Sequence, residues 1–400
     1  MYFKGLSIVA LAIVLIIHAT GLLASDTRLH SMANVGGLTK DYYNMFDLPS
    51  AIVSYPNLLV LGFGGTNFSY DGETPGTSTP FAGATVGLMA GHVVGVFVSG
   101  DREKLPFSPT DIDYQYNLFY GFKLKALTLG IRFNNASGRD KVSGYPESQL
   151  GPSGNYEKSV GVIGLTIGGG LELSGNGSAE AAFHYQTTSF SDKEDKQTNT
   201  EPEAYRTIGF RGRLFYGLNE KTELVPFFSY ENEGQGQQVY INNEKSNAQT
   251  LQTTEFVVGI GVNLKPAENM LMIGGIGYLQ SSIVSEYKPV NGAKQESESS
   301  LKGLPIIQLG FEAQLKSWLT LRTGAQKLAG AVESKQTVSD NTITTESGYS
   351  PFGFSVGIGF EHKNLSIDFM LDRDYLKRGP YILSGSTGRM FPRATATYAF

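Results

Sequence analysis

The sequence contains no cysteine and, beyond its first 25 residues, no long apolar run. The absence of cysteine excludes both a disulfide framework and a lipoprotein-type lipid anchor. A helix needs about twenty consecutive apolar residues to cross a bilayer, and no later stretch approaches that length. The remaining chain must therefore be soluble or cross a membrane as a β-barrel. The formal net charge of −5 argues against a nucleic-acid partner.

The first 25 residues have the pattern of a secretory signal peptide. Lys4 is followed by the apolar run LSIVALAIVLII and then by the small, weakly polar HATGLLAS. A run of about twelve apolar residues is too short to span a bilayer and suits the core of a signal peptide. We predict a signal peptide over 1–25, cleaved after Gly21 or Ala24.

The last ten residues, FPRATATYAF, have the pattern of a closing barrel strand. Every second side chain of a strand shares a face. One face would carry Ala394, Ala396, Tyr398 and Phe400 toward lipid, and the other Arg393, Thr395 and Thr397 toward the lumen. The aromatic ending resembles the signal that the bacterial barrel-assembly machinery reads, so Tyr398 and Phe400 are the candidate assembly signal. A soluble strand that happens to end on an aromatic residue is the alternative.

Strand-like segments alternate with short and long connections along the rest of the chain. The short connections are expected at 90–92, 124–127, 174–177, 218–221, 265–269, 316–318 and 362–364. The long, polar ones are expected at 66–80, 100–111, 135–156, 189–202, 231–250, 282–300, 330–349 and 372–390. Short turns at one end and long loops at the other are typical of outer-membrane barrels. We predict an all-β, antiparallel up-and-down transmembrane barrel over 57–400, with about 16 strands (14 as the alternative count) and both termini periplasmic.

Apolar and polar side chains alternate clearly in several of these segments. In 206–217, Ile208 and Phe210 share one face, and Arg211 and Arg213 share the other. The same division gives the candidate lumen-lining residues Arg132, Glu172, Arg211, Arg213, Glu312, Arg322, Glu361, Asp368 and Arg393. They could line a charged pore or pair with one another and with a plug, and we favour the paired arrangement. Segments 58–64, 223–231 and 270–279 have apolar residues on both faces.

Residues 26–56 lack strand alternation. Met32 to Gly37 are rich in glycine, Asp41 and Asn44 form a polar pair, and Leu48-Pro49-Ser50 precedes the first strand. This order resembles the opening of FadL-type transporters, in which a Gly-rich part, an acidic residue and an Asn lead to an Asn-Pro-Ala signature. The resemblance implies a partial plug in the periplasmic mouth, with Asp41, Asn44, Asp47 and Pro49 as plug candidates.

Catalysis has little support in the sequence. His30, His92, His184 and His362 are scattered without metal-ligand spacing, so we expect no enzyme activity, no metal and no cofactor. The sequence instead predicts a bacterial outer-membrane porin or plugged transporter for a small solute of unknown identity. Its expected partners are that solute, membrane lipid and the barrel-assembly machinery. A non-transport barrel that serves as a secretion partner or surface anchor is the alternative.

Overall fold

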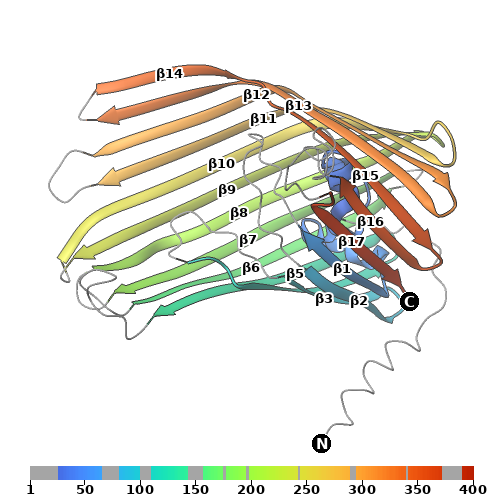
Figure 1. Ribbon diagram of the computed structural model, residues 1–400, viewed down its shortest axis with the longest axis horizontal. Helices are drawn as coiled ribbons and strands as arrows, with labels where there is room; N and C mark the ends of the chain where they lie inside the picture. The colour runs from blue at the N-terminus through green and yellow to red at the C-terminus, as the bar shows by residue number, and fades with distance from the viewer. Residues whose placement is uncertain are drawn as a thin grey trace, which may run out of the picture.

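The computed structural model is a closed antiparallel β-barrel with a short helical segment inside it (Figure 1). It describes residues 26–64, 81–99, 110–142, 156–173, 177–194, 198–241, 244–288, 294–338, 341–371 and 390–400. Both the predicted signal peptide over 1–25 and the short connection predicted at 174–177 fall largely outside these ranges. No helix in the described part is long and apolar enough to cross a bilayer.

In the described residues, four short helices precede seventeen strands. The helices are α2 (Asp26–Ser31), η1 (Val35–Leu38), η2 (Tyr42–Phe46) and η3 (Pro49–Ser54). The strands are β1 (Leu58–Gly64), β2 (Phe81–Met89), β3 (His92–Ser99), β4 (Tyr114–Leu124), β5 (Leu127–Val142), β6 (Tyr156–Leu173), β7 (Gly177–Glu194), β8 (Thr198–Asn219), β9 (Thr222–Ile241), β10 (Glu244–Leu264), β11 (Met270–Lys288), β12 (Gln295–Lys316), β13 (Leu319–Val338), β14 (Asn341–Tyr349), β15 (Phe352–His362), β16 (Leu365–Leu371) and β17 (Arg393–Ala399).

The ring closes between its first and last strands. β1 pairs with β17 in antiparallel register from Leu58 opposite Ala399 to Gly64 opposite Arg393. β13 pairs with β15 over its first half and with β14 over its second half. β14 and β15 therefore occupy the same position in the ring, interrupted at Ser350 and Pro351. With β14 set aside, sixteen of the seventeen strands form the ring. The predicted barrel of about 16 strands is confirmed.

The strands are much longer than the sequence suggested, which corrects four predicted loops. The ranges 189–202, 231–250, 282–300 and 330–349 are mainly β-strand. β8 and β12 have 22 residues each, a length of about 70 Å at the usual rise per residue, whereas the lipid-facing band of a barrel is about 25 Å tall. Outside a bilayer both strand faces meet water, so these extensions lack the apolar face on which the strand prediction depended. The other predicted long loops lie largely outside the described residues.

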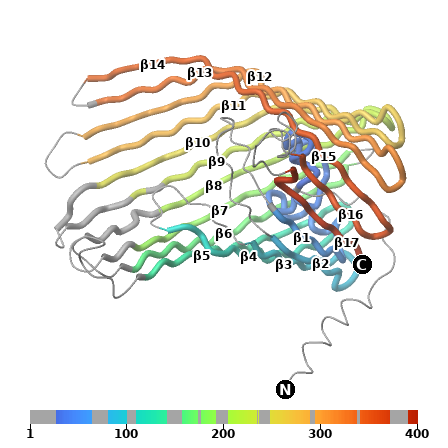
Figure 2. Tube along the Cα trace, in the orientation of Figure 1, coloured from blue at the N-terminus to red at the C-terminus, as the bar shows by residue number. Residues whose placement is uncertain are grey.

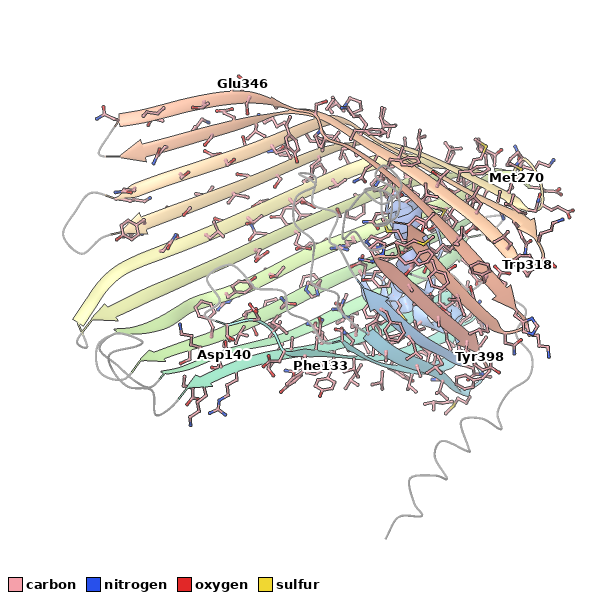
Figure 3. The ribbon with its side chains drawn as sticks, viewed as in Figure 1. Phe133, Asp140, Met270, Trp318, Glu346 and Tyr398 are labelled. Carbon is pink, nitrogen blue, oxygen red and sulfur yellow. The ribbon has the colours of Figure 1, made fainter. Side chains whose placement is uncertain are left out.

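The two ends of the barrel differ. Short turns such as Ala90–Gly91 and Lys125–Ala126 lie at one end, here called the turn end, together with the carboxyl terminus. The opposite end, here called the extended end, is where the long strands project. Figure 3 shows Met270, Trp318 and Tyr398 at the turn end and Asp140 and Glu346 toward the extended end.

The outer surface is apolar, as a transmembrane barrel requires. On β1, the side chains of Leu59, Leu61 and Phe63 are 42, 40 and 59% exposed, whereas Leu58 and Val60 are buried. β17 alternates in the same way, with Thr395 and Thr397 buried inside the barrel and Ala394, Ala396 and Tyr398 on the outer side. The predicted faces of the closing strand are therefore confirmed from Arg393 to Tyr398, and Phe400 lies beyond the end of the strand.

The three strands with apolar residues on both faces have a common explanation. Leu58, Val225 and Ile273 point inward from β1, β9 and β11 and pack against the helical segment. Their inner faces thus meet protein rather than water. An apolar inner face marks the places where the lumen is filled.

Candidate functional site

Residues 26–56, here called the inner segment, lie inside the barrel at its turn end (Figure 2). α2 contacts β13, β15, β16 and β17; η1 contacts β9 to β12; and η3 contacts β3 to β6. The segment therefore touches the wall on several sides of the ring. Two apolar cores hold it: Tyr42, Met45 and Ile52 pack against β1, β3 and β4, and Met32, Val35 and Leu38 pack against β8, β9 and β11.

Glycines on the inner wall let the backbone of the inner segment come close. A Cβ atom added at Gly130 would lie 2.3 Å from the carbonyl of Pro49, and one added at Gly324 would lie 2.1 Å from the carbonyl carbon of Met32. Real Cβ atoms do not approach backbone so closely, so any other residue there would displace the segment. This close approach requires glycine at both positions.

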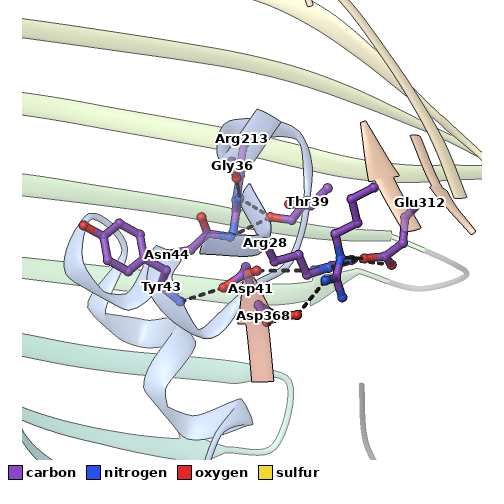
Figure 4. A network of polar contacts seen from close by, with 10 residues as sticks. Arg28, Gly36, Thr39, Asp41, Tyr43, Asn44, Arg213, Glu312 and Asp368 are labelled. Atoms are coloured by element: carbon purple, nitrogen blue, oxygen red, sulfur yellow. Dashed lines mark hydrogen bonds and ion pairs between the residues drawn. The ribbon is translucent and has the colours of Figure 1, made fainter. Parts of the chain in front are cut away.

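A buried charge network joins the inner segment to the wall (Figure 4). Arg28 Nε lies 2.6 Å from Glu312 Oε2, and its Nη1 lies 3.3 Å from Asp41 Oδ2. Arg322 lies 2.6 Å from the same Glu312 oxygen and 2.5 Å from Asp368 Oδ1. All five side chains are at least nine-tenths buried. Glu312 therefore bridges one arginine of the segment and one of the wall.

The network contains three carboxyl groups and two guanidinium groups. Burial raises the pKa of the Asp41 carboxyl to about 7, against the opposing attraction of Arg28 and the hydrogen bond from the Tyr43 N–H. Protonation of Asp41 near neutral pH would bring the network closer to neutrality, because it leaves two carboxylates beside the two guanidinium groups.

Arg213 of β8 fixes the backbone of the inner segment after η1. Its Nη1 donates to the carbonyl oxygens of Gly36 at 3.0 Å and Thr39 at 2.7 Å, and its Nε lies 2.7 Å from Glu180. Asn263 of β10 donates to the Leu38 carbonyl at 2.8 Å. The wall thus satisfies carbonyl groups that this short turn leaves without partners of its own.

A second polar group lies where η2 ends. Arg132 of β5 donates to the Phe46 carbonyl and, through Nε, to Asn117 Oδ1 at 2.9 Å. Arg211 of β8 lies 2.5 Å from Asp47 and 3.2 Å from Glu231. Asp47 is exposed to the lumen, unlike Asp41 and Asn44.

The remaining candidates are spread around the turn end. Arg393 contacts the ring of His30 at 2.9 Å, and Pro49 begins η3 against the wall. Asn44 donates to the Thr39 carbonyl at 2.6 Å, a bond within the segment. Glu172 is exposed at the rim, 2.5 Å from Lys123, and Glu361 is half-buried on β15, within electrostatic range of Arg322 and Asp368.

Sequence reasoning missed Arg28, Glu180, Glu231 and Asn263. Glu231 fell at the edge of a predicted loop and of a segment with apolar residues on both faces, and Glu180 and Asn263 lie on strands for which no lumen-lining residue was named. Arg28 had only one signal, its position as the single arginine of the inner segment. Within the described part of the chain, no group of three metal-ligating side chains is present.

The described residues bound two cavities that lie against the inner segment. The smaller, about 190 Å³, is bounded by Phe46, Asp47 and wall residues of β5 to β9. The larger, about 600 Å³, runs along η1 and η2 beside β8 to β12. Asp47 and Arg211 line both, so the two cavities are neighbours. The described residues therefore leave space between the inner segment and these strands.

No family model matches the chain, and neither does any curated protein. Solved structures do match it. The CymD monoaromatic hydrocarbon channel is 10% identical, with 96% of this chain and 99% of that one covered and a TM-score of 0.41. The ferric yersiniabactin uptake receptor FyuA from Yersinia pestis is 8% identical, with 79% of this chain and 68% of that one covered and a TM-score of 0.38. CdiB from Escherichia coli is 8% identical, with 86% of this chain and 63% of that one covered and a TM-score of 0.42. The architecture of this chain is established by its own strand pairing, which makes it a sixteen-stranded transmembrane-type β-barrel.

Proposed function

We propose that this protein is an outer-membrane channel or transporter for small solutes, in which the inner segment acts as a plug at the periplasmic end of the lumen. The observation that carries the proposal is the pair of cavities that the described residues leave beside the inner segment. A scaffold that only anchors other proteins has no need of solute-sized space there, whereas a transport protein needs it. The apolar outer surface supports the membrane location.

The way the segment is held supports a plug rather than a loose tail. Its backbone contacts wall glycines directly, and Arg213 and Arg132 donate to its carbonyl groups. Sixteen strands alone enclose a lumen wide enough for an aqueous channel. The segment therefore occupies space through which solutes would otherwise pass.

Deleting residues 26–56 while keeping the signal peptide should raise single-channel conductance in planar bilayers severalfold over that of the full mature chain. The physical reason is steric, because the deletion returns the turn end of the lumen to water. A matched control replaces residues 26–56 by a Gly-Ser chain of equal length. Equal, large conductance with and without the segment would show an open porin. The absence of conductance in the folded deletion variant would favour an anchor or secretion partner.

The proposed orientation places both termini and the short turns in the periplasm, with the extended strands outside the cell. An epitope inserted between β9 and β10, or between β13 and β14, should be accessible to antibody on intact cells. An epitope at the Glu220–Lys221 turn should become accessible only after the outer membrane is permeabilised. Labelling in the reverse order would overturn the orientation.

A further inference from the structure

The smaller cavity, here called the mixed-charge pocket, combines groups of both signs on different parts of its wall. Arg132 and His184 come from β5 and β7, and Glu231 comes from β9, while Asp47 comes from the inner segment. Its volume of about 190 Å³ suits the head group of a small organic molecule.

Arg132 supplies positive charge: it makes no ion pair with a described carboxylate, although Asp47 lies within electrostatic range. Its Nε donates to Asn117 Oδ1, its Nη1 donates to the Phe46 carbonyl, and its guanidinium carbon lies 5.7 Å from the Phe46 ring centre. These partners are all uncharged. Beside it, His184 Nδ1 bonds with Thr166 Oγ1 at 2.9 Å, and its other ring nitrogen makes no bond within the described residues. This side of the pocket suits a carboxylate, which would accept from both residues.

The opposite side has surplus negative charge. Asp47 and Glu231 share the single guanidinium of Arg211, at 2.5 and 3.2 Å. Glu255 lies directly across the β9–β10 pair from Glu231, so a third carboxylate adds to the same side. Like charges opposite one another on neighbouring strands are unfavourable unless a cation intervenes. This side suits an ammonium group.

We propose that the mixed-charge pocket binds the zwitterionic head of an amino acid, with its carboxylate at Arg132 and His184 and its ammonium group at Asp47 and Glu231. The inference rests on the proposed transport function and names its solute class. The side chain of the ligand extends into the neighbouring larger cavity, whose wall includes Phe227, Val257 and Leu279. That cavity also has polar lining residues, among them Asn34, Ser229 and Gln308, so the head group rather than the side chain defines the solute class.

The charge arrangement also selects against related molecules. A ligand with a carboxylate but no amine leaves the surplus negative charge of Asp47, Glu231 and Glu255 uncompensated. The same charge also repels that ligand. An amine without a carboxylate leaves Arg132 without an ionic partner. Discrimination of this kind arises from the unpaired group as much as from the paired one.

The test is calorimetric titration of the full mature protein in detergent with three ligands of matched shape: leucine, 4-methylpentanoate and 3-methylbutylamine. Leucine should bind at least about tenfold more tightly than either analogue, because each analogue loses one set of charge-assisted hydrogen bonds. Arg132→Gln should weaken leucine and 4-methylpentanoate and spare the amine. Glu231→Gln should weaken leucine and the amine. Arg139→Gln is the matched control, since Arg139 lies on the same strand and pairs with Glu157 at the surface.

Binding of 4-methylpentanoate as tight as that of leucine would overturn the proposal in favour of a simple anion site. Equal affinity for all three ligands, or no binding of any, would also overturn it. If Arg132→Gln does not fold, the Glu231→Gln variant and the three ligands with the natural protein still test whether the pocket binds a zwitterionic head group. Conductance of the variant lacking residues 26–56 judges the transport proposal separately, so failure of one is distinguishable from failure of the other.

Discussion

Replacing Glu312 with glutamine is expected to destabilise the folded barrel by about 3–5 kcal/mol, because the change leaves buried arginines without their shared carboxylate. Glu312 Oε2 lies 2.6 Å from both Arg28 Nε and Arg322 Nε. The amide oxygen of glutamine can still accept one hydrogen bond, but it carries no negative charge. Arg28 should lose most, since its other carboxyl partner, Asp41, lies at 3.3 Å.

Urea unfolding of the protein from lipid vesicles, followed by the fluorescence of Trp318, measures this loss. Glu296→Gln is the matched control on the same strand, because Glu296 pairs with Lys294 at 2.9 Å with both side chains near 45% exposed. Such surface pairs contribute about 0–1 kcal/mol. Equal midpoints for the two variants would show that the buried network contributes no more than a surface pair.

Deleting Phe400 is expected to remove most of the folded barrel from the outer membrane of living cells. We propose Tyr398 and Phe400 as the signal for the barrel-assembly machinery; Tyr398 lies on the outer side of β17, and Phe400 follows one residue after the strand ends. In the folded state the deletion removes little, since Phe400 contributes one backbone hydrogen bond, from its N–H to the Asn57 carbonyl at 2.9 Å. The expected effect is therefore on assembly rather than on the stability of the finished barrel.

Heat-modifiable migration on gels reports the folded fraction in cells, and refolding of purified protein into lipid vesicles reports folding without the machinery. The deletion should sharply lower the folded fraction in cells and leave refolding into vesicles nearly unchanged. Phe63→Ser is the control, since Phe63 is a lipid-side aromatic on the strand that pairs with β17. An unchanged folded fraction in cells would remove the assembly role of Phe400.

The barrel wall was predictable from sequence wherever one strand face meets lipid. Tyr398 and Phe400, or Ile208 and Phe210, show the two-residue period because their partners face a polar interior. The extended end was not predictable in this way, because neither face of 282–300 or 330–349 has to be apolar outside a bilayer. The strands remain paired there through backbone hydrogen bonds, which the pattern of apolar and polar side chains does not reveal.

The candidate site was predictable as a set of inward charges but not as a set of pairs. Alternation placed Glu312, Arg322 and Asp368 inside, and the structure brings these three together. Their partner Arg28 is 284 residues from Glu312 along the chain, and no local pattern links them. The inner segment decides which inward charges meet, and its path across the lumen follows from packing against glycines that the sequence does not distinguish from other glycines of the wall.

The attachments of the inner segment also have a mechanical meaning. A closed cylinder of strands can flatten toward an ellipse without breaking a single backbone hydrogen bond. Here Thr27 bonds to Thr395 of β17, Arg28 to Glu312 of β12 and Thr39 to Arg213 of β8. These points lie at separate places around the circumference, so the segment cross-links distant strands of the wall. We expect these cross-links to keep the cross-section round at the turn end. Removing them should make the wall easier to deform as well as opening the lumen.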